Sequence, residues 1–132
     1  MRILIDTNIL FSALLFPHSK PTHALLYIAN NHEIVLCDRN IIESRDILKR
    51  KAPKFLPVAE VLLSEMSYER IPAIRHTEKR IRDPKDQPIL NAAIISNVDI
   101  ILTGDKNFLS LEMDHPKIMT IAQFFTFENI ED

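Results

Sequence analysis

The sequence predicts an α/β fold, with a central parallel sheet between helices in a three-layer α/β/α arrangement. Two observations support this prediction. Short apolar runs rich in β-branched residues alternate with longer segments of helical periodicity, the order that successive β-α-β units produce. These runs are apolar on both faces, which is typical of parallel strands covered by helices on each side. A chain of 132 residues can bury its own core, and we expect a single domain, 1–132.

Four runs have the composition of strands, and a fifth suits only a sheet edge. The expected strands are residues 2–5, 34–37, 99–103 and, with a weaker pattern, 117–120. Residues 70–74 contain Pro72, which has no N–H to donate to a central ladder. We therefore expect at most a short edge element there.

Helical segments fill the intervals between the strands. The expected helices are residues 8–15, 22–31, 40–51, 54–67, 87–96 and 121–127. Pro17 ends the first helix, Pro53 separates the third from the fourth, and Thr120 is placed to cap the last. Segment 87–96 has the strongest pattern, because an almost continuous apolar surface runs from Ile89 to Ile94.

The composition narrows the range of functions. The single glycine, Gly104, argues against the glycine-rich loops that hold phosphates in dinucleotide-binding folds and Walker-type NTPases. The one cysteine, Cys37, excludes an internal disulfide, and the five histidines have no metal-binding spacing. We expect a cytoplasmic protein, because the N-terminus lacks a signal-peptide pattern and no apolar window is long enough to span a membrane.

The charge gives mixed evidence on nucleic-acid binding. A net charge of −2 argues against a broad nucleic-acid-binding surface, although bound metal ions would supply positive charge locally. Basic residues gather in two clusters, where a solvated surface is the more common role and contact with a phosphate backbone is the alternative. The clusters are Lys49, Arg50, Lys51 and Lys54, and Arg75, His76, Lys79, Arg80 and Arg82.

Four acidic residues stand where the predicted topology brings strand ends together. Asp6 directly follows the first strand, and Asp105 follows the strand 99–103 across the turn at Gly104. Asp86 begins the helix that leads into that strand, and Glu43 lies in the first turn of the helix entered after residues 34–37. Because ligands of open parallel sheets bind at the carboxyl ends of the strands, we expect the four acids to reach one site.

Converging carboxylates repel one another, and bound cations relieve that repulsion. A set of oxygen ligands without histidine or cysteine favours Mg²⁺ or Mn²⁺ over zinc. Two such ions, about 3.5–4 Å apart, would activate a water and stabilise the leaving oxygen of an in-line phosphodiester displacement. The pattern therefore predicts a metal-dependent site for phosphodiester hydrolysis.

Each acid also has a purely structural explanation. Asp6 would cap the following helix, Asp86 would be an ordinary N-cap, and Asp105 would be a turn residue. Taken alone, Glu43 is better explained structurally, because Asn40 and Glu43 have the spacing of a capping box. The common placement of the four acids, rather than any one of them, favours a functional site.

The segments that carry these acids, taken in their order along the chain, resemble the PIN domain family of nucleases. The resemblance is in particular to its bacterial and archaeal branch of VapC-like toxins from toxin–antitoxin pairs. The resemblance covers residues 5–109, and residues 117–125 also suit the family. Any one match is weak, whereas the ordered set is fairly specific. The matching segments are IDTNIL at 5–10, IE at 42–43 with IL at 47–48, DPKD at 83–86 leading into ILNAA at 89–93, and TGDKNFL at 103–109.

The resemblance implies a toxin that cleaves RNA with Mg²⁺ or Mn²⁺, an antitoxin protein as partner and, often, a homodimer. Residue by residue, the family's acidic quartet matches Asp6, Glu43, Asp86 and Asp105, and its surrounding polar positions match Asn8, Thr103 and Asn107. Some members carry a further acid where this chain has Asn107, which argues against a direct metal contact there. Asp83 is an extra carboxylate that would replace or support Asp86.

The mechanism expected on this basis has Asp6 and Asp86 anchoring the main metal ion, with Glu43 and Asp105 completing the cup directly or through water. The apolar stretch Leu10, Phe11, Leu14 and Leu15 would pack the first helix against a partner subunit. A helix that faces the core of its own chain is the simpler explanation of that stretch.

Three alternatives compete with this interpretation. A haloacid-dehalogenase-like phosphatase needs a second Asp two residues after the first, where this chain has Asn8. A receiver domain needs an adjacent acidic pair after the first strand, which Asp6-Thr7 does not provide. A catalytically silent PIN-like module that binds RNA or a protein differs in class, and the retained quartet weighs against it.

Overall fold

The computed structural model of the chain describes residues 1–74 and 85–131. Five strands form one sheet in the order β3-β2-β1-β4-β5, and each adjacent pair is parallel. The strands are β1 (Arg2–Ile5), β2 (Glu33–Cys37), β3 (Glu69–Ile71), β4 (Ile100–Leu102) and β5 (Lys117–Met119). The predicted parallel α/β/α fold is confirmed. The short edge element expected within residues 70–74 is β3, which lies slightly earlier and ends before Pro72.

The helices follow the predicted order with small shifts at their ends. They are α1 (Thr7–Leu15), α2 (Lys20–Asn31), α3 (Asp38–Lys51), α4 (Leu56–Glu65), α5 (Gln87–Ile95), α6 (Lys106–Leu109) and α7 (Ile121–Phe127), with a 3-10 turn η1 (Pro53–Phe55). The predicted helix 54–67 divides into η1 and the shorter α4. Helix α6 was not predicted, because four residues are too few to show helical periodicity.

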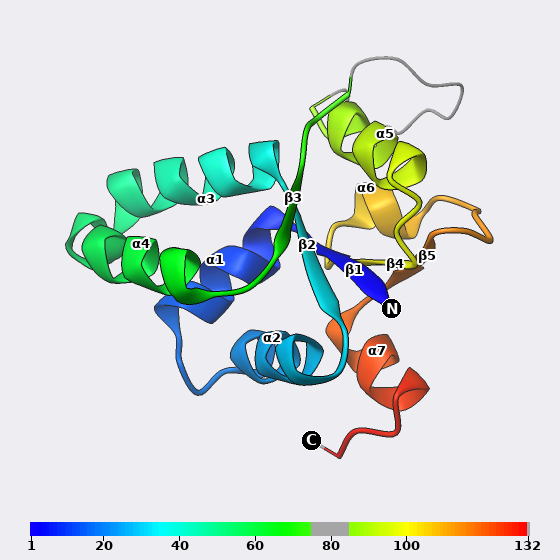
Figure 1. Ribbon diagram of the computed structural model, residues 1–132, viewed down its shortest axis with the longest axis horizontal. Coiled ribbons are helices and arrows are strands. Elements are labelled where there is room, and N and C mark those ends of the chain that lie inside the picture. Colours follow the sequence, from blue (N-terminus) through cyan, green and yellow to red (C-terminus); the bar gives the residue numbers. More distant parts are fainter. Residues whose placement is uncertain (75–84, 132) are drawn as a thin grey trace.

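The sheet separates two apolar cores, as Figure 1 shows by the helices on either side of the strands. The larger core packs α1, α2, α3, α4 and α7 against one face, and the smaller core packs α5 and α6 against the other. Strand β1 supplies both, because Ile3 and Ile5 point into the larger core and Leu4 into the smaller. All three side chains are fully buried, which explains why these strands lack a polar face.

Helix α1 belongs to the interior of this chain. Leu10 and Leu14 are buried in the larger core, and Phe11 and Leu15 pack against it. The core-facing explanation of this apolar stretch is therefore the right one for Leu10 and Leu14. Leu10 is fully covered by its own chain and is not available to a partner subunit, whereas Leu14 also lines an apolar groove at the surface.

The chain changes direction across the sheet at β1. It moves from β1 to β2 on one side and reaches β4, on the other side of β1, only after α5. Such a switch point leaves a crevice at the carboxyl ends of the two central strands, because the connections leave in opposite directions. Asp6 and Thr103 directly follow β1 and β4, so both residues stand at this crevice.

Within the described parts of the chain, no helix is both long and apolar enough to cross a membrane.

Candidate active site

Asp6 is held in place by both of its carboxylate oxygens. Its Oδ1 accepts a hydrogen bond from the Ile9 N–H at 2.9 Å and so caps helix α1. Its Oδ2 accepts a hydrogen bond from the Thr103 hydroxyl, which follows β4. Asp6 is only 7% exposed, so this anchoring fixes a nearly buried carboxylate at the switch point of the sheet. Asp6 therefore does cap helix α1, and the cap uses only one of its two carboxylate oxygens.

Burial raises the pKa of Asp6, because the charged form loses water that the hydrogen bonds only partly replace. The Thr103 hydroxyl and the backbone N–H groups of Ile9 and Gly104 act in the opposite direction, and the nearby charge of Asp105 adds to the rise. An ionised Asp6 is therefore strained electrostatically in the protein alone. A cation beside it would relieve that strain.

Thr103 links Asp6 to Asp105. Its fully buried hydroxyl donates to Asp6 Oδ2 and accepts from the Asp105 N–H at 2.9 Å. Asp105 in turn caps α6, since its Oδ1 accepts from the Asn107 N–H at 2.8 Å. The turn that carries the second acid is thereby tied to the first.

Replacing Thr103 by valine should lower the free energy of unfolding by about 1–3 kcal/mol, because it leaves the partly buried Asp105 N–H and a buried Asp6 carboxylate oxygen without their partner. Chemical denaturation of Thr103→Val and Thr103→Ser would measure this. Serine keeps both hydrogen bonds and leaves only a gap the size of a methyl group, so its loss should be smaller. A valine variant as stable as the unaltered protein would show that the hydroxyl does not organise the turn.

Glu43 lies on helix α3, which directly follows β2, and it is close enough for the charge of Asp6 to affect its pKa. The capping box suggested by its spacing from Asn40 is wrong, because α3 begins at Asp38 and Asn40 lies inside the helix. The Asn40 Nδ2 instead donates to the Thr7 hydroxyl at 2.9 Å, which fastens α3 to the start of α1. Partial burial raises the pKa of Glu43, and the positive charges of Arg39 and Lys85 oppose this rise.

Asp86 stands at the N-cap position of helix α5. Its side chain makes no capping hydrogen bond, in contrast to Asp6 and Asp105. The purely structural explanation for Asp86 therefore lacks the contact on which it depends. The carboxylate is partly buried, and its Oδ2 is shielded from solvent.

One pocket of about 100 Å³ collects all four predicted acids in its lining. The helix ends at the carboxyl edge of the sheet supply the wall, and no Lys or Arg contributes to it among the described residues. The lining residues are Asp6, Thr7, Asn8, Asn40, Glu43, Ile47, Asp86, Ile89, Asp105 and Phe108. The structure thus brings the four acids to one pocket, while their chemical roles stay predictions.

The four carboxylates line the pocket without closing on a single point. In the described ranges, no three His, Cys, Asp or Glu side chains form a group arranged to hold a metal ion. Mg²⁺ in enzymes usually keeps several waters and is bound by one or two carboxylates plus substrate phosphates, so a compact cage of acids is not its usual site. The donor set and the pocket suit such an open site.

The other predicted residues fall into different places. Asn8 is exposed at the pocket, whereas Asn107 is a helix residue whose N–H binds Asp105. Asp83 and the basic cluster Arg75, His76, Lys79, Arg80 and Arg82 lie outside the described residues. Two polar lining residues were missed as site residues, Thr7 and Asn40, since only their packing across α1 and α3 identifies them.

An open parallel sheet with an acid-lined pocket at its switch point defines an α/β protein with a polar site at the carboxyl edge. Comparison with protein families identifies this class further, because the PIN domain model matches residues 2–107. The chain belongs to the PIN domain family.

Comparison with solved structures supports the same fold. A chain in the crystal structure of VapBC2 from Rickettsia felis bound to a DNA fragment from their promoter superposes with a TM-score of 0.67. The match covers 91% of this chain and 98% of that chain, at 16% sequence identity. No curated protein sequence matches the chain.

Proposed function

We propose that this PIN domain protein is a metal-dependent endoribonuclease that hydrolyses RNA phosphodiester bonds in the pocket at the carboxyl edge of the sheet. The observation that carries the proposal is the gathering of Asp6, Glu43, Asp86 and Asp105 in the lining of that one pocket. Family membership supports it, because the same four residues match the acidic quartet of PIN nucleases.

The residues of the pocket fit a hard divalent cation, Mg²⁺ or Mn²⁺. Their donors are carboxylate oxygens, and the raised pKa values of Asp6 and Glu43 show that the pocket disfavours negative charge when no cation balances it. Asn40 gives a second indication that the pocket holds a cation, because its Oδ1 is buried without a hydrogen-bond partner among the described residues. Asp6 and Asp86 would hold the main ion, with Glu43 and Asp105 completing the site directly or through water.

When bound, the cation supplies Lewis-acid chemistry, which polarises the phosphodiester and makes an attacking water more acidic. The protein's own contribution is positional. Thr103 and the Ile9 N–H fix the direction of the Asp6 carboxylate, and Asn40 fixes the start of α1 against the helix that carries Glu43. Such prior ordering means that the carboxylates need not be rearranged when the phosphate arrives.

A direct test is cleavage of a mixed pool of single-stranded and structured RNA by the purified protein with Mg²⁺, Mn²⁺ or EDTA. We expect cutting with either metal and none with EDTA. Cleavage that persists in EDTA would contradict a metal-dependent site. An absence of cleavage in a protein that still binds Mn²⁺ would favour the silent RNA- or protein-binding module.

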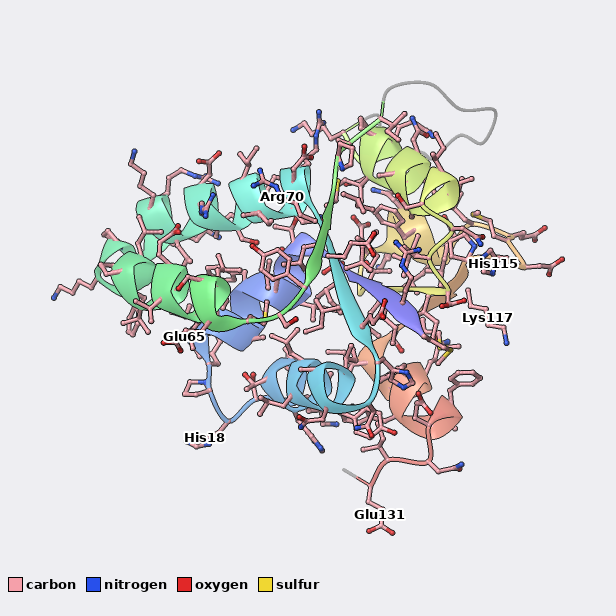
Figure 2. All side chains as sticks on the ribbon, viewed as in Figure 1. His18, Glu65, Arg70, His115, Lys117 and Glu131 are labelled. Carbon is pink, nitrogen blue, oxygen red and sulfur yellow. The ribbon has the colours of Figure 1, made fainter. Side chains whose placement is uncertain are left out.

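We further propose that the chain is the toxin of a toxin–antitoxin pair and acts in the cytoplasm. The resemblance to VapC-like proteins and the fold shared with a chain of VapBC2 support this proposal. The chain also has a surface that suits a protein partner. An apolar groove of about 310 Å³ lies between α1, α2 and α4, with Glu65, labelled in Figure 2, on its α4 side. Such a groove suits the apolar face of an amphipathic helix.

Replacing Leu26 by aspartate should weaken antitoxin binding by about 2 kcal/mol, roughly 30-fold, because Leu26 lines the groove and would be desolvated by the partner. Calorimetric titration with the protein encoded beside its gene would measure this. Ile95→Asp is a matched control, since both side chains are 59% exposed and Ile95 lies on α5, away from the groove. Equal affinity of the two variants would place the antitoxin elsewhere.

The homodimer implied by the resemblance remains part of this proposal, with an interface that does not use Leu10. Sedimentation of the purified protein at several concentrations would determine its state.

A further inference from the structure

A second and larger pocket adjoins the acid pocket and shares Glu43 with it. Its volume is about 670 Å³, within the range of about 300–1,000 Å³ that is typical of small-ligand sites. Helix α3 forms one wall, and the residues on either side of the start of α5 form the other. Its lining consists of Asp38, Arg39, Ile42, Glu43, Ala73, Lys85 and Pro88.

This pocket has the positive charges that the acid pocket lacks. Arg39 lies on α3 and Lys85 in the turn before α5, and the Arg39 Nη1 donates to the Lys85 carbonyl oxygen at 3.4 Å. Both charges lie close enough to Glu43 to lower its pKa against the effect of burial. The one acid of this pocket outside the predicted quartet, Asp38, uses its Oδ1 to accept the Ala73 N–H at 3.0 Å.

The remaining lining is apolar and accessible. Ile42 is 52% exposed although it is a large aliphatic residue on the helix that carries Glu43, and Pro88 and Ala73 lie on the opposite side. A pocket that combines two cations with an aliphatic wall matches the two parts of a nucleotide, a phosphate and the flat face of a base. An unstacked base is available to proteins in single-stranded RNA, whereas in a duplex it is stacked and paired.

We propose that this pocket binds the nucleotide adjacent to the cleaved phosphate in single-stranded RNA, with Arg39 and Lys85 on its phosphate and Ile42 and Pro88 against its base. The inference rests on the proposed ribonuclease function, since it places the neighbouring phosphate in the acid pocket. The shared residue Glu43 makes the two pockets continuous, so one strand can occupy both. Arg39 and Lys85 are thereby assigned as substrate-positioning residues.

The double variant Arg39→Gln/Lys85→Gln tests this assignment. Cleavage of a fluorescein-labelled single-stranded RNA decamer of mixed sequence would be followed with Mn²⁺ at pH 8, over a range of KCl concentrations. We expect KM to rise about tenfold at low salt and kcat to change by less than about twofold, as loss of uniform substrate binding predicts.

The salt dependence gives a readout that a merely structural role would not change. Each phosphate neutralised on a single strand contributes about −0.7 to the slope of log affinity against log salt. Because Arg39 and Lys85 are assigned to one phosphate, the slope of log kcat/KM should become less negative by about 0.7. Lys49→Gln/Arg50→Gln is the matched control, because it removes the same charge from the exposed far end of α3. That control should keep the KM and the slope of the unaltered protein.

Three results would overturn the inference. If the unaltered protein cleaves the decamer and the Arg39/Lys85 variant behaves like the control, the pocket does not bind RNA and the ribonuclease function stands. A fall in kcat at unchanged KM would show that the two cations act through Glu43 instead of on the substrate. No cleavage by the unaltered protein in Mn²⁺ would remove the proposed function, and this inference with it.

Discussion

Replacing Asp6 by asparagine is expected to abolish metal-dependent RNA cleavage while the fold is retained. Asparagine keeps an oxygen that accepts the Ile9 N–H, so the cap of helix α1 survives. It removes the charge that would hold the cation, and metal catalysis is worth several kcal/mol of transition-state stabilisation. We therefore expect kcat/KM to fall by about a thousandfold or more.

The same substitution should change stability in two opposite ways in the absence of metal. Asparagine removes the buried charge whose pKa is raised by burial, and this raises the free energy of unfolding at neutral pH. Its single oxygen can accept the Ile9 N–H or the Thr103 hydroxyl but not both, and the lost hydrogen bond costs about 1–3 kcal/mol. Thermal melts in EDTA should therefore place Asp6→Asn close to the unaltered protein, with about 3–5 °C for each kcal/mol of net difference. Asp6→Ala should lose activity as well, but it should melt lower than Asp6→Asn because the cap is lost.

A matched control separates the loss of this charge from the loss of any carboxylate. Asp114→Asn makes the same change at an exposed residue that precedes β5, and so lies toward the amino end of that strand, away from the acid pocket at the carboxyl edge. It should retain both activity and stability. Cleavage that survives Asp6→Asn would indicate a contaminating nuclease or a site elsewhere, and either result would contradict the proposed pocket.

The fold could be predicted because the local signals and the tertiary structure agree. Strands buried on both faces are uniformly apolar, and Ile3, Leu4 and Ile5 show why, since they alternate between two cores. The boundaries of α3 were less predictable. Asn40 looked like a helix cap, yet its side chain binds Thr7, which is 33 residues away, and no local pattern contains that contact.

The site was predictable only in part. The topology is enough to place Asp6 and Asp105 together, because the ends of β1 and β4 are neighbours in a switched parallel sheet. It is not enough to reveal Thr103 as the bridge between them, or Arg39 and Lys85 as neighbours of Glu43. These contacts depend on how helices pack, and the spacing of residues along the chain does not encode it.

Divalent metal should stabilise the protein most at neutral pH and lose this effect on acidification. Asp6 and Glu43 both have raised pKa values in the folded state, so the folded protein without metal binds more protons than the unfolded chain. Their contribution to stability is fully present below the unfolded values, near pH 4, and is lost as the pH rises through the folded values. Mn²⁺ competes with those protons, and it should restore stability where both carboxylates are ionised.

The expected size follows from mass action. At 100 times its dissociation constant, Mn²⁺ should raise the free energy of unfolding by about 2.7 kcal/mol at pH 7.5. Denaturation from pH 4 to pH 8, with Mn²⁺ or EDTA, would compare the unaltered protein with Asp6→Asn/Glu43→Gln. Surface ion pairs such as Arg45–Glu60 are common to both proteins, so their pH dependence cancels in the difference.

In EDTA, the unaltered protein should lose stability relative to this double variant as the pH rises, and only the unaltered protein should respond to Mn²⁺. Parallel pH profiles would show that burial of Asp6 and Glu43 does not strain the folded state. An equal response to Mn²⁺ would place the ion outside the acid pocket. Because neither readout involves RNA, a protein that passes both tests but cuts no RNA would have its metal site in place, and this result would favour the silent RNA- or protein-binding module.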